Sequence, residues 1–193
     1  MFLVLLGAVA ASVGKSAYPF AFAPQPFLAG GWREEPWMWL SPLISAFLAR
    51  DFLTTAFNLI FLLIAGRFVE KAVRPLGLGI LFVAGAYGGA LARLILTPGS
   101  FTLSAGADAA VFAVIGAYLM LYGVPNVFPN VTRGHSRSVQ IAILAAIWMA
   151  MQVVFALVAG GFELSETMIK PLGGLVAGVA LARPLLAWTY RKA

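Results

Sequence analysis

Long apolar runs separated by short polar segments make up most of the chain. Five of these runs are close to the about 20 residues that an α-helix needs to cross the hydrocarbon core of a bilayer. They occupy residues 52–69, 76–96, 105–122, 139–159 and 172–188. Each ends at charged residues, proline or glycine, which are typical of loops. With a further apolar run at the N-terminus, the pattern predicts an all-α integral membrane protein of six transmembrane helices, in one domain over residues 1–193.

The first apolar run, residues 1–13, is short for a transmembrane helix. Thirteen residues at a rise of about 1.5 Å cover about 20 Å of a hydrocarbon core that is roughly 30 Å thick. We expect the helix to continue past Lys15 toward Ala23, with the Lys15 ammonium reaching the headgroups. Two alternatives stay open: the core of a signal peptide, although no basic residue precedes the run, or a chain that starts upstream.

Proline and aromatic residues fill the connection between the first two predicted helices, residues 16–51. Trp32, Trp37 and Trp39 suit the membrane–water interface, where tryptophan is enriched. Neighbouring charges such as Arg33 keep the segment at the headgroups. The sequence therefore predicts a long interfacial loop with short helices, partly embedded in the membrane.

Basic residues are distributed unevenly between the two sides that six helices define. The side with the 67–74 loop, the 125–138 loop and the C-terminus has eight Lys or Arg residues, and the other side has four. Because cytoplasmic loops carry an excess of basic residues, we expect both termini in the cytoplasm and the loop 16–51 in the periplasm. The richness in Ala, Gly and Arg favours a bacterial cytoplasmic (inner) membrane.

The composition supports this class of protein and excludes several kinds of site. Hydrophobic residues make up 62% of the chain and charged residues only 10%, whereas soluble domains carry roughly 25% charged residues. The absence of cysteine and the single histidine, His135, exclude disulfides, thiolate metal sites and His-rich metal sites, so no metal or cofactor is expected. In so apolar a chain, the excess of 13 basic over 7 acidic residues sets topology and does not indicate nucleic-acid binding.

Small residues recur four positions apart on two of the predicted helices. Gly85 and Gly89 lie on the third helix, and Gly174 and Gly178 lie on the sixth. This spacing lets helix backbones approach closely in a membrane. The fourth helix has a face of Gly and Ala residues, which suits the centre of the bundle.

Three phrases, in order along the chain, match one known family. Residues 48–70 read LARDFLTTAFNLIFLLIAGRFVE, residues 97–121 read TPGSFTLSAGADAAVFAVIGAYLML, and residues 171–178 read PLGGLVAG. Together with six helices and a long first loop, they resemble the rhomboid family of intramembrane serine proteases over about residues 40–185. The resemblance implies a rhomboid-like bundle with its active site at the outer ends of three helices.

The family's active-site positions are largely substituted in this chain. The resemblance places Asp108 at the nucleophilic serine and Pro171 at the catalytic histidine. At the start of the second helix, Ala49 and Thr54 take the places of two histidines, and only Asn58, part of the oxyanion-stabilising group, is retained. Proline has no ionisable side chain and cannot act as a general base. We therefore expect a catalytically inactive, rhomboid-like pseudoprotease.

Asp108 is the acidic residue that the pattern places deepest in the membrane. A carboxylate at that depth costs about 2.5–3.5 kcal/mol on insertion scales, so a compensating interaction is expected. Lys170 and Arg93 are the candidate cations of an intramembrane ion-pair network, and Thr54 and Asn58 are candidate hydrogen-bond donors. A protonated carboxyl in contact with water, or a ligand or transport site, remain as alternatives.

The function expected from the resemblance is non-enzymatic. Inactive rhomboid-like proteins bind transmembrane helices or client proteins, so we expect a scaffold or accessory subunit of a membrane complex whose partners are lipids and other integral membrane proteins. The candidate partner-binding residues, for which lipid contact is an equal explanation, are Trp32, Trp37 and Trp39 in the first loop and Trp148, Met149, Met151 and Phe155 on the fifth helix.

Two other functions stay open. A residual peptidase could use Ser104 or Ser165 with Lys170, or pair Asp108 with a second carboxylate, although no motif supports either arrangement and neither Glu70 nor Asp51 is a convincing partner. A small transporter could use Asp108, although no inverted repeat or pair of broken helices is apparent in the sequence.

Overall fold

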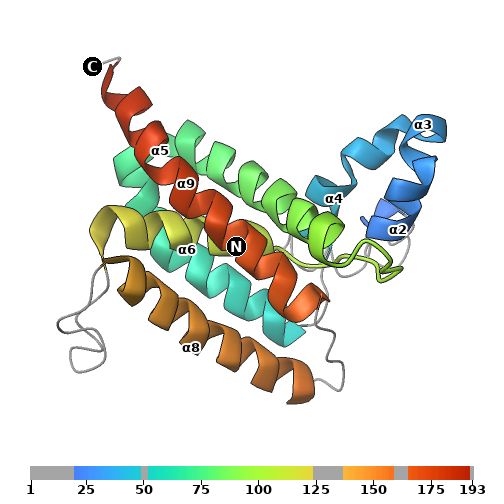
Figure 1. The fold of residues 1–193 in the computed structure, drawn as a ribbon. Helices are drawn as coiled ribbons and strands as arrows, with labels where there is room; N and C mark the ends of the chain where they lie inside the picture. The colour runs from blue at the N-terminus through green and yellow to red at the C-terminus, as the bar shows by residue number, and fades with distance from the viewer. Residues whose placement is uncertain (1–19, 49–51, 124–136, 159–164, 192–193) are drawn as a thin grey trace.

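A computed structural model describes residues 20–48, 52–123, 137–158 and 165–191, and within these ranges every regular element is helical (Figure 1). Four long helices form the bundle: α5 (Phe52–Leu96), α6 (Asp108–Tyr122), α8 (Arg137–Val158) and α9 (Lys170–Arg191). The all-helical prediction is confirmed for these residues. The predicted first helix lies outside them, so the number six stays a prediction.

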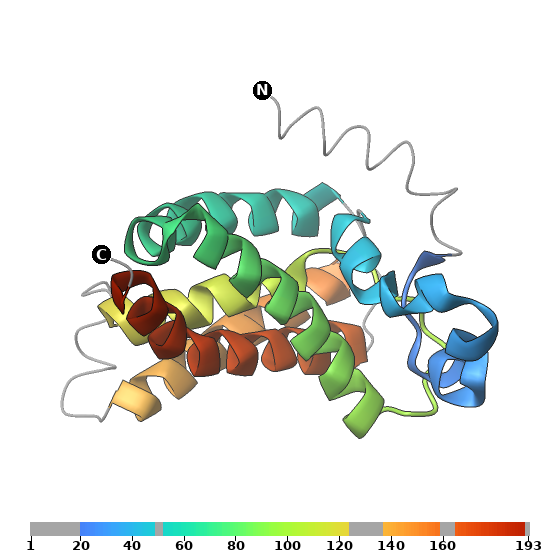
Figure 2. The same cartoon turned by 90° about the horizontal axis from the view of Figure 1, so that it is seen from above.

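Helix α5 consists of two arms that fold back on each other (Figure 2). The break is at Arg74, whose backbone angles of φ 65° and ψ 166° are not helical, and it is followed by Pro75. The first arm is longer than the predicted helix 52–69, because it continues through the charged residues to Val73. Arg and Lys are good helix formers, so charge alone does not end a helix, whereas a proline strongly disfavours helical geometry at the residue before it.

Among the described residues, two helical stretches are long and apolar enough to cross a membrane: Thr54–Leu96, which contains most of both arms of α5, and Glu166–Arg191. Asp108–Tyr122 is apolar but shorter, with 15 residues. At a rise of about 1.5 Å per residue it extends about 22 Å, less than the hydrocarbon core. This shorter helix is also the most buried one, which explains how a short segment is accommodated inside the bundle.

Helix α6 is the centre of the bundle, and α5 and α9 pack on it. Most of its residues are buried, including Ala110, Phe112 and Ala113 at 0–1% exposure. Gly85 of α5 faces Ala109 and Ala113, and in α9 Gly174 faces Ala109 while Gly178 faces Ala113. The predicted small-residue contacts are therefore present between α5, α6 and α9. Helix α8 joins through a cluster of Met149, Phe112 and Leu175.

A separate helical segment, residues 20–48, lies beside one end of the bundle, and we call it the N-terminal cap (Figure 1). Its ring contacts include Phe27 with Trp39, at 5.1 Å between centroids, and Phe20 with Trp37, at 4.9 Å. The Tyr87 hydroxyl of α5 donates a hydrogen bond of 2.8 Å to the Trp39 carbonyl. Its short helices are α2 (Pro24–Pro26), η2 (Phe27–Gly31), α3 (Trp32–Glu34), η3 (Pro36–Trp39) and α4 (Ser41–Phe47).

Candidate functional site

The candidate site lies where the segment 97–107 enters α6. The helix begins at Asp108, three residues later than the predicted start at residue 105. Gly106 adopts a φ of 94°, which glycine tolerates and which interrupts the helix before Asp108. Residues 101–105 have no regular structure, so their backbone groups are free to contact side chains from other helices. The Asp108 carboxylate lies in the first helical turn, where the helix dipole favours a negative charge.

Two side chains from different helices hold the Asp108 carboxylate. The Asn58 amide of α5 donates a hydrogen bond of 2.5 Å to Oδ1, and the Lys170 ammonium of α9 lies 3.6 Å from Oδ2. Asn58, Asp108 and Lys170 are each at most 5% exposed. The carboxylate therefore joins the first arm of α5, α6 and α9 at one end of the bundle.

Lys170 is a buried cation with several hydrogen-bond acceptors around it. Its ammonium donates hydrogen bonds to the Ala105 carbonyl at 2.7 Å, to the Gly106 carbonyl at 3.0 Å and to Glu166 Oε2 at 3.2 Å. With Asp108 as a fourth neighbour, all three ammonium hydrogens are directed to acceptors. The ammonium thus ties the segment before α6 to α9 through charge-assisted hydrogen bonds.

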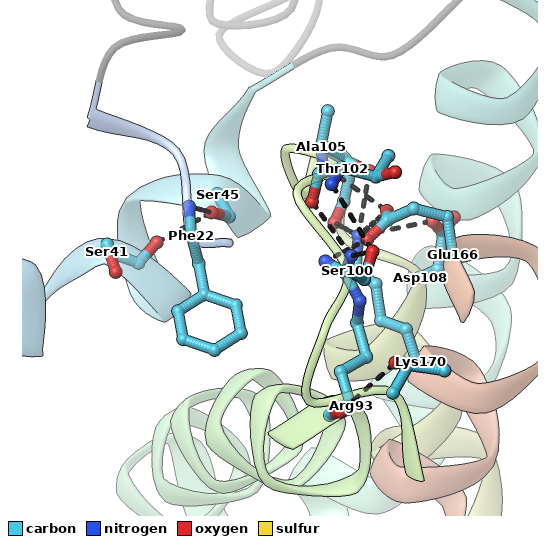
Figure 3. A network of polar contacts seen from close by, with 12 residues as sticks. Phe22, Ser41, Ser45, Arg93, Ser100, Thr102, Ala105, Asp108, Glu166 and Lys170 are labelled. Carbon is cyan, nitrogen blue, oxygen red and sulfur yellow. Dashed lines mark hydrogen bonds and ion pairs between the residues drawn. The ribbon is translucent and has the colours of Figure 1, made fainter. Parts of the chain in front are cut away.

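Arg93 reaches the network through Glu166. The two side chains form an ion pair of 2.5 Å, with Arg93 at 0% and Glu166 at 3% exposure (Figure 3). Arg93 also donates to the Thr102 carbonyl at 2.8 Å, and the Ala105 N–H donates to Glu166 Oε2 at 3.4 Å. The site thus contains two buried cations and two buried carboxylates, which balance each other as buried charges must.

Glu166 is the member that the sequence analysis missed. The predicted helices 139–159 and 172–188 place Glu166 in the loop between them, but helical structure already begins at Ser165, in the π-helical turn η4 (Ser165–Ile169). That turn directs Glu166 inward. One sequence signal was available: Glu166 precedes Lys170 by four residues, the order and spacing that favour an ion pair on a helix.

The other predicted site residues differ in burial, and some of them lie outside the described residues or side chains. Pro171 is fully buried in the first turn of α9, directly after Lys170. Thr54 is half-buried one turn before Asn58. Trp39 is 54% exposed, whereas Trp32 and Trp37 are half-buried. The predictions that fall outside the described residues or side chains concern Ala49, Trp148, Met151 and Phe155.

The same segment that carries the site also anchors the N-terminal cap. The Ser104 N–H donates to the Phe22 carbonyl at 2.7 Å, and the Gln25 N–H donates to the Ser100 carbonyl at 3.1 Å. The Gly106 N–H donates to the Ser45 carbonyl at 3.1 Å. Residues 100–106 are therefore held by the cap on one side and by the buried charges on the other.

Truncation of Asp108 tests whether its carboxylate is structural. In Asp108→Ala the Asn58 amide loses its acceptor and Lys170 keeps only Glu166 and two carbonyls. We expect a loss of about 1.5–3 kcal/mol, the range for charged hydrogen bonds. Thermal unfolding of the purified protein in mild detergent measures it. Asp108→Asn keeps the shape and is expected to be intermediate. Unchanged stability in both variants would show that the carboxylate has no structural role.

Both cations and both carboxylates of the described site are engaged with one another. Among the described residues, no group of three or more His, Asp or Glu side chains is placed to bind a metal ion. What the geometry provides is a neutral, buried network that joins three helices and one loop.

Comparison with known proteins identifies the family. Residues 33–188 match the family model of the Rhomboid domain. No curated protein and no solved structure matches the chain. The matched region contains both arms of α5, all of α6 and α8, and the first five turns of α9. Since it spans most of the sequence, the chain belongs to the rhomboid family.

Proposed function

We propose that this rhomboid-family protein is a pseudoprotease: a non-enzymatic integral membrane protein that binds transmembrane segments of other proteins, as a scaffold or accessory subunit of a membrane complex. The observation that carries the proposal is the state of Asp108. It occupies the position that the resemblance assigns to the nucleophilic serine, and its carboxylate is tied to Asn58 and Lys170.

The chemistry of the substituted positions supports this proposal. A serine protease needs a hydroxyl within hydrogen-bond reach of a general base. Asp108 offers a carboxylate in place of the hydroxyl, and the buried Pro171 offers no base in place of the histidine. Asn58, which the resemblance assigns to oxyanion stabilisation, donates instead to Asp108.

A residual peptidase and a small transporter are less favoured by the same contacts. A Ser-Lys peptidase requires a lysine within hydrogen-bond reach of the serine hydroxyl, but the Lys170 ammonium contacts two carbonyls and two carboxylates. A transporter that uses Asp108 requires a carboxylate that the solute can reach, and Asp108 is 3% exposed and in contact with Lys170 and Asn58.

The surface available for partners is apolar and continuous with the lipid-facing helices. Ile60, Leu63 and Ile64 on the first arm of α5 are 50–57% exposed, as is Trp39 on the cap at 54%. Exposed apolar helix faces of this kind accept either lipid chains or a second transmembrane helix. We propose that a client helix packs along the first arm of α5, close to the cap.

The activity half of the proposal is tested with a fluorophosphonate probe, which labels activated serines. We expect no labelling of the purified protein in detergent or in liposomes, because the serine position holds a carboxylate. An active rhomboid protease treated in parallel serves as the positive control. Labelling that disappears in Ser104→Ala would overturn the assignment as a pseudoprotease.

The binding half is tested by purification from native membranes in mild detergent, followed by mass spectrometry. We expect at least one integral membrane protein to co-purify at a fixed ratio, and Leu63→Trp, which enlarges the exposed face of α5, to reduce its amount. Leu96→Trp, at an equally exposed position on the second arm, is the matched control. A lone monomer in several detergents would contradict a role as a complex subunit.

The charge distribution also supports a membrane orientation. Of the described cations that are exposed, all except Arg33 lie at the end of the bundle with the α5 turn and the α9 C-terminus. We propose that this end faces the cytoplasm of a bacterial inner membrane and that the cap lies at the periplasmic surface.

A further inference from the structure

Among the side chains that the structure describes, five exposed cations lie at the end of the bundle opposite the buried network, and we call this set the basic end. The turn of α5, the end of α6 and the C-terminal end of α9 lie together there (Figures 1 and 2). The Thr189 hydroxyl of α9 donates to the Val73 carbonyl of α5 at 3.3 Å, which fixes the two elements side by side. The basic end consists of Arg67, Lys71, Arg74, Arg183 and Arg191.

The opposite end differs in charge. Glu70 is the single described acid at the basic end. At the other end of the described structure the exposed charges are Arg33, Glu34 and Glu35, and the buried network is balanced. Anions are therefore attracted to one end of this molecule and not to the other.

Arg74 stands out within the basic end because of its backbone. Its φ of 65° with ψ of 166° lies in a region that is essentially restricted to glycine, and it is the only non-glycine residue with positive φ in the described chain. Glycine at this turn would adopt the same angles without strain. The chain instead has an exposed arginine at this turn. A guanidinium that binds an anion would explain why a strained arginine takes the place of glycine.

Aromatic side chains place the basic end at the level of lipid headgroups. Tyr118 stacks on Tyr122, and both rings contact Phe68 in an edge-to-face arrangement. The Tyr122 hydroxyl donates to the Phe68 carbonyl at 2.8 Å. Tyr190 on α9 is 65% exposed. Tyrosines gathered at one end of a transmembrane bundle are typical of the membrane–water interface.

We propose that the basic end is a binding site for the phosphate groups of anionic phospholipids, with Lys71 and Arg74 as its principal contacts. Lys71 lies one helical turn after Arg67 and three residues before Arg74, so these cations project from the last turns of one arm and from its terminus. A phosphodiester between two acyl chains and a polar headgroup is the anion that occurs at this depth of a membrane. The proposal is independent of whether the protein is a protease.

The test uses the full chain in a neutral detergent, with added phosphatidylglycerol or phosphatidylcholine, followed by native mass spectrometry and thermal unfolding. Phosphatidylglycerol is expected to bind and to raise the unfolding temperature, and phosphatidylcholine is not. Removal of one cation, in Lys71→Gln or Arg74→Gly, is expected to weaken phosphatidylglycerol binding about fivefold. Arg33→Gln, at the opposite end, is the matched control and leaves binding unchanged.

The unfolding temperature of an Arg74 variant without lipid is a second readout, because it separates a loss of lipid binding from misfolding. Arg74→Gly relieves the strained backbone, so its unfolding temperature without lipid is expected to be equal to or above that of the parent, although its lipid binding is weaker. Arg74→Lys keeps both charge and strain and retains binding. Equal binding of the two lipids, wild-type affinity in both Lys71→Gln and Arg74→Gly, or full stabilisation by inorganic phosphate alone would each overturn the proposal.

Discussion

Glu166→Gln is expected to lower the free energy of unfolding by about 3–5 kcal/mol, the cost of leaving a buried charge without its partner. The substitution keeps the shape of the side chain and removes one negative charge. Arg93 at 0% exposure then loses its ion-pair partner, and Lys170 keeps only Asp108 and two carbonyls. Because Glu166 serves both cations whereas Asp108 serves one, this effect exceeds that of Asp108→Ala.

Thermal or denaturant unfolding of the purified protein in mild detergent measures the change. Glu70→Gln is the matched control, since it removes the same charge from an exposed position of α5 and is expected to change stability by at most about 0.5 kcal/mol. In the double variant Arg93→Met/Glu166→Gln the uncompensated cation is absent, so the loss should be smaller than the sum of the two single losses. Equal stability of Glu166→Gln and Glu70→Gln would contradict a structural role for the network.

The loss of Glu166 also has a predicted consequence for the cap. Residues 100–106 are held by Arg93, Glu166 and Lys170 on one side, while their backbone pairs with the cap on the other. Loss of the contacts with Glu166 leaves residues 100–106 less firmly held, and these are the residues to which the cap is hydrogen-bonded. The same buried network therefore helps to position the cap beside the bundle.

The sequence was sufficient to predict the long helices that the structure describes, because long apolar runs leave few alternatives in a membrane. The helix ends were harder, since they depend on local backbone geometry. The segment 67–73 contains charged residues, but the first arm of α5 continues through it. The helix breaks only at Arg74, directly before Pro75. Residues 105–107 are apolar and read as helix, but the left-handed Gly106 delays the start of α6 to Asp108.

The buried network was only partly predictable. Asp108 and Lys170 could be related because the resemblance aligned their helices and because a carboxylate at membrane depth requires a cation. Glu166 read as a loop charge, since polarity in a sequence does not reveal whether a side chain turns inward. Its partner Arg93 comes from a different helix, and only the folded chain brings the two together. The cap contacts were not predictable, because backbone hydrogen bonds such as Ser104 to Phe22 leave no side-chain pattern.

The close contact of α6 with α9 leads to the second large prediction. In Gly178→Ala the added Cβ would overlap the Ala113 carbonyl oxygen and lie 2.6 Å from the Ala113 Cα. Both are backbone atoms at the centre of α6, where Ala113 is 0% exposed. No side chain can rotate away to make room, so the two helices must separate along the contact. We expect a loss of about 3 kcal/mol, at the upper end of the range for overpacked cores.

Gly79→Ala is the matched control, because it adds the same methyl group to a helix of the same bundle. Its Cβ would meet nothing within 4 Å, so only the helix propensity changes and stability should rise by about 0.5–1 kcal/mol. The two variants are therefore expected to change the free energy of unfolding in opposite directions. Lys170 lies on α9, eight residues before Gly178. Separation of α9 from α6 therefore also displaces Lys170 from Asp108. A Gly178→Ala protein that unfolds like Gly79→Ala would mean that α6 and α9 are not packed this closely, and that the contacts of Lys170 with the α6 terminus do not hold the bundle together.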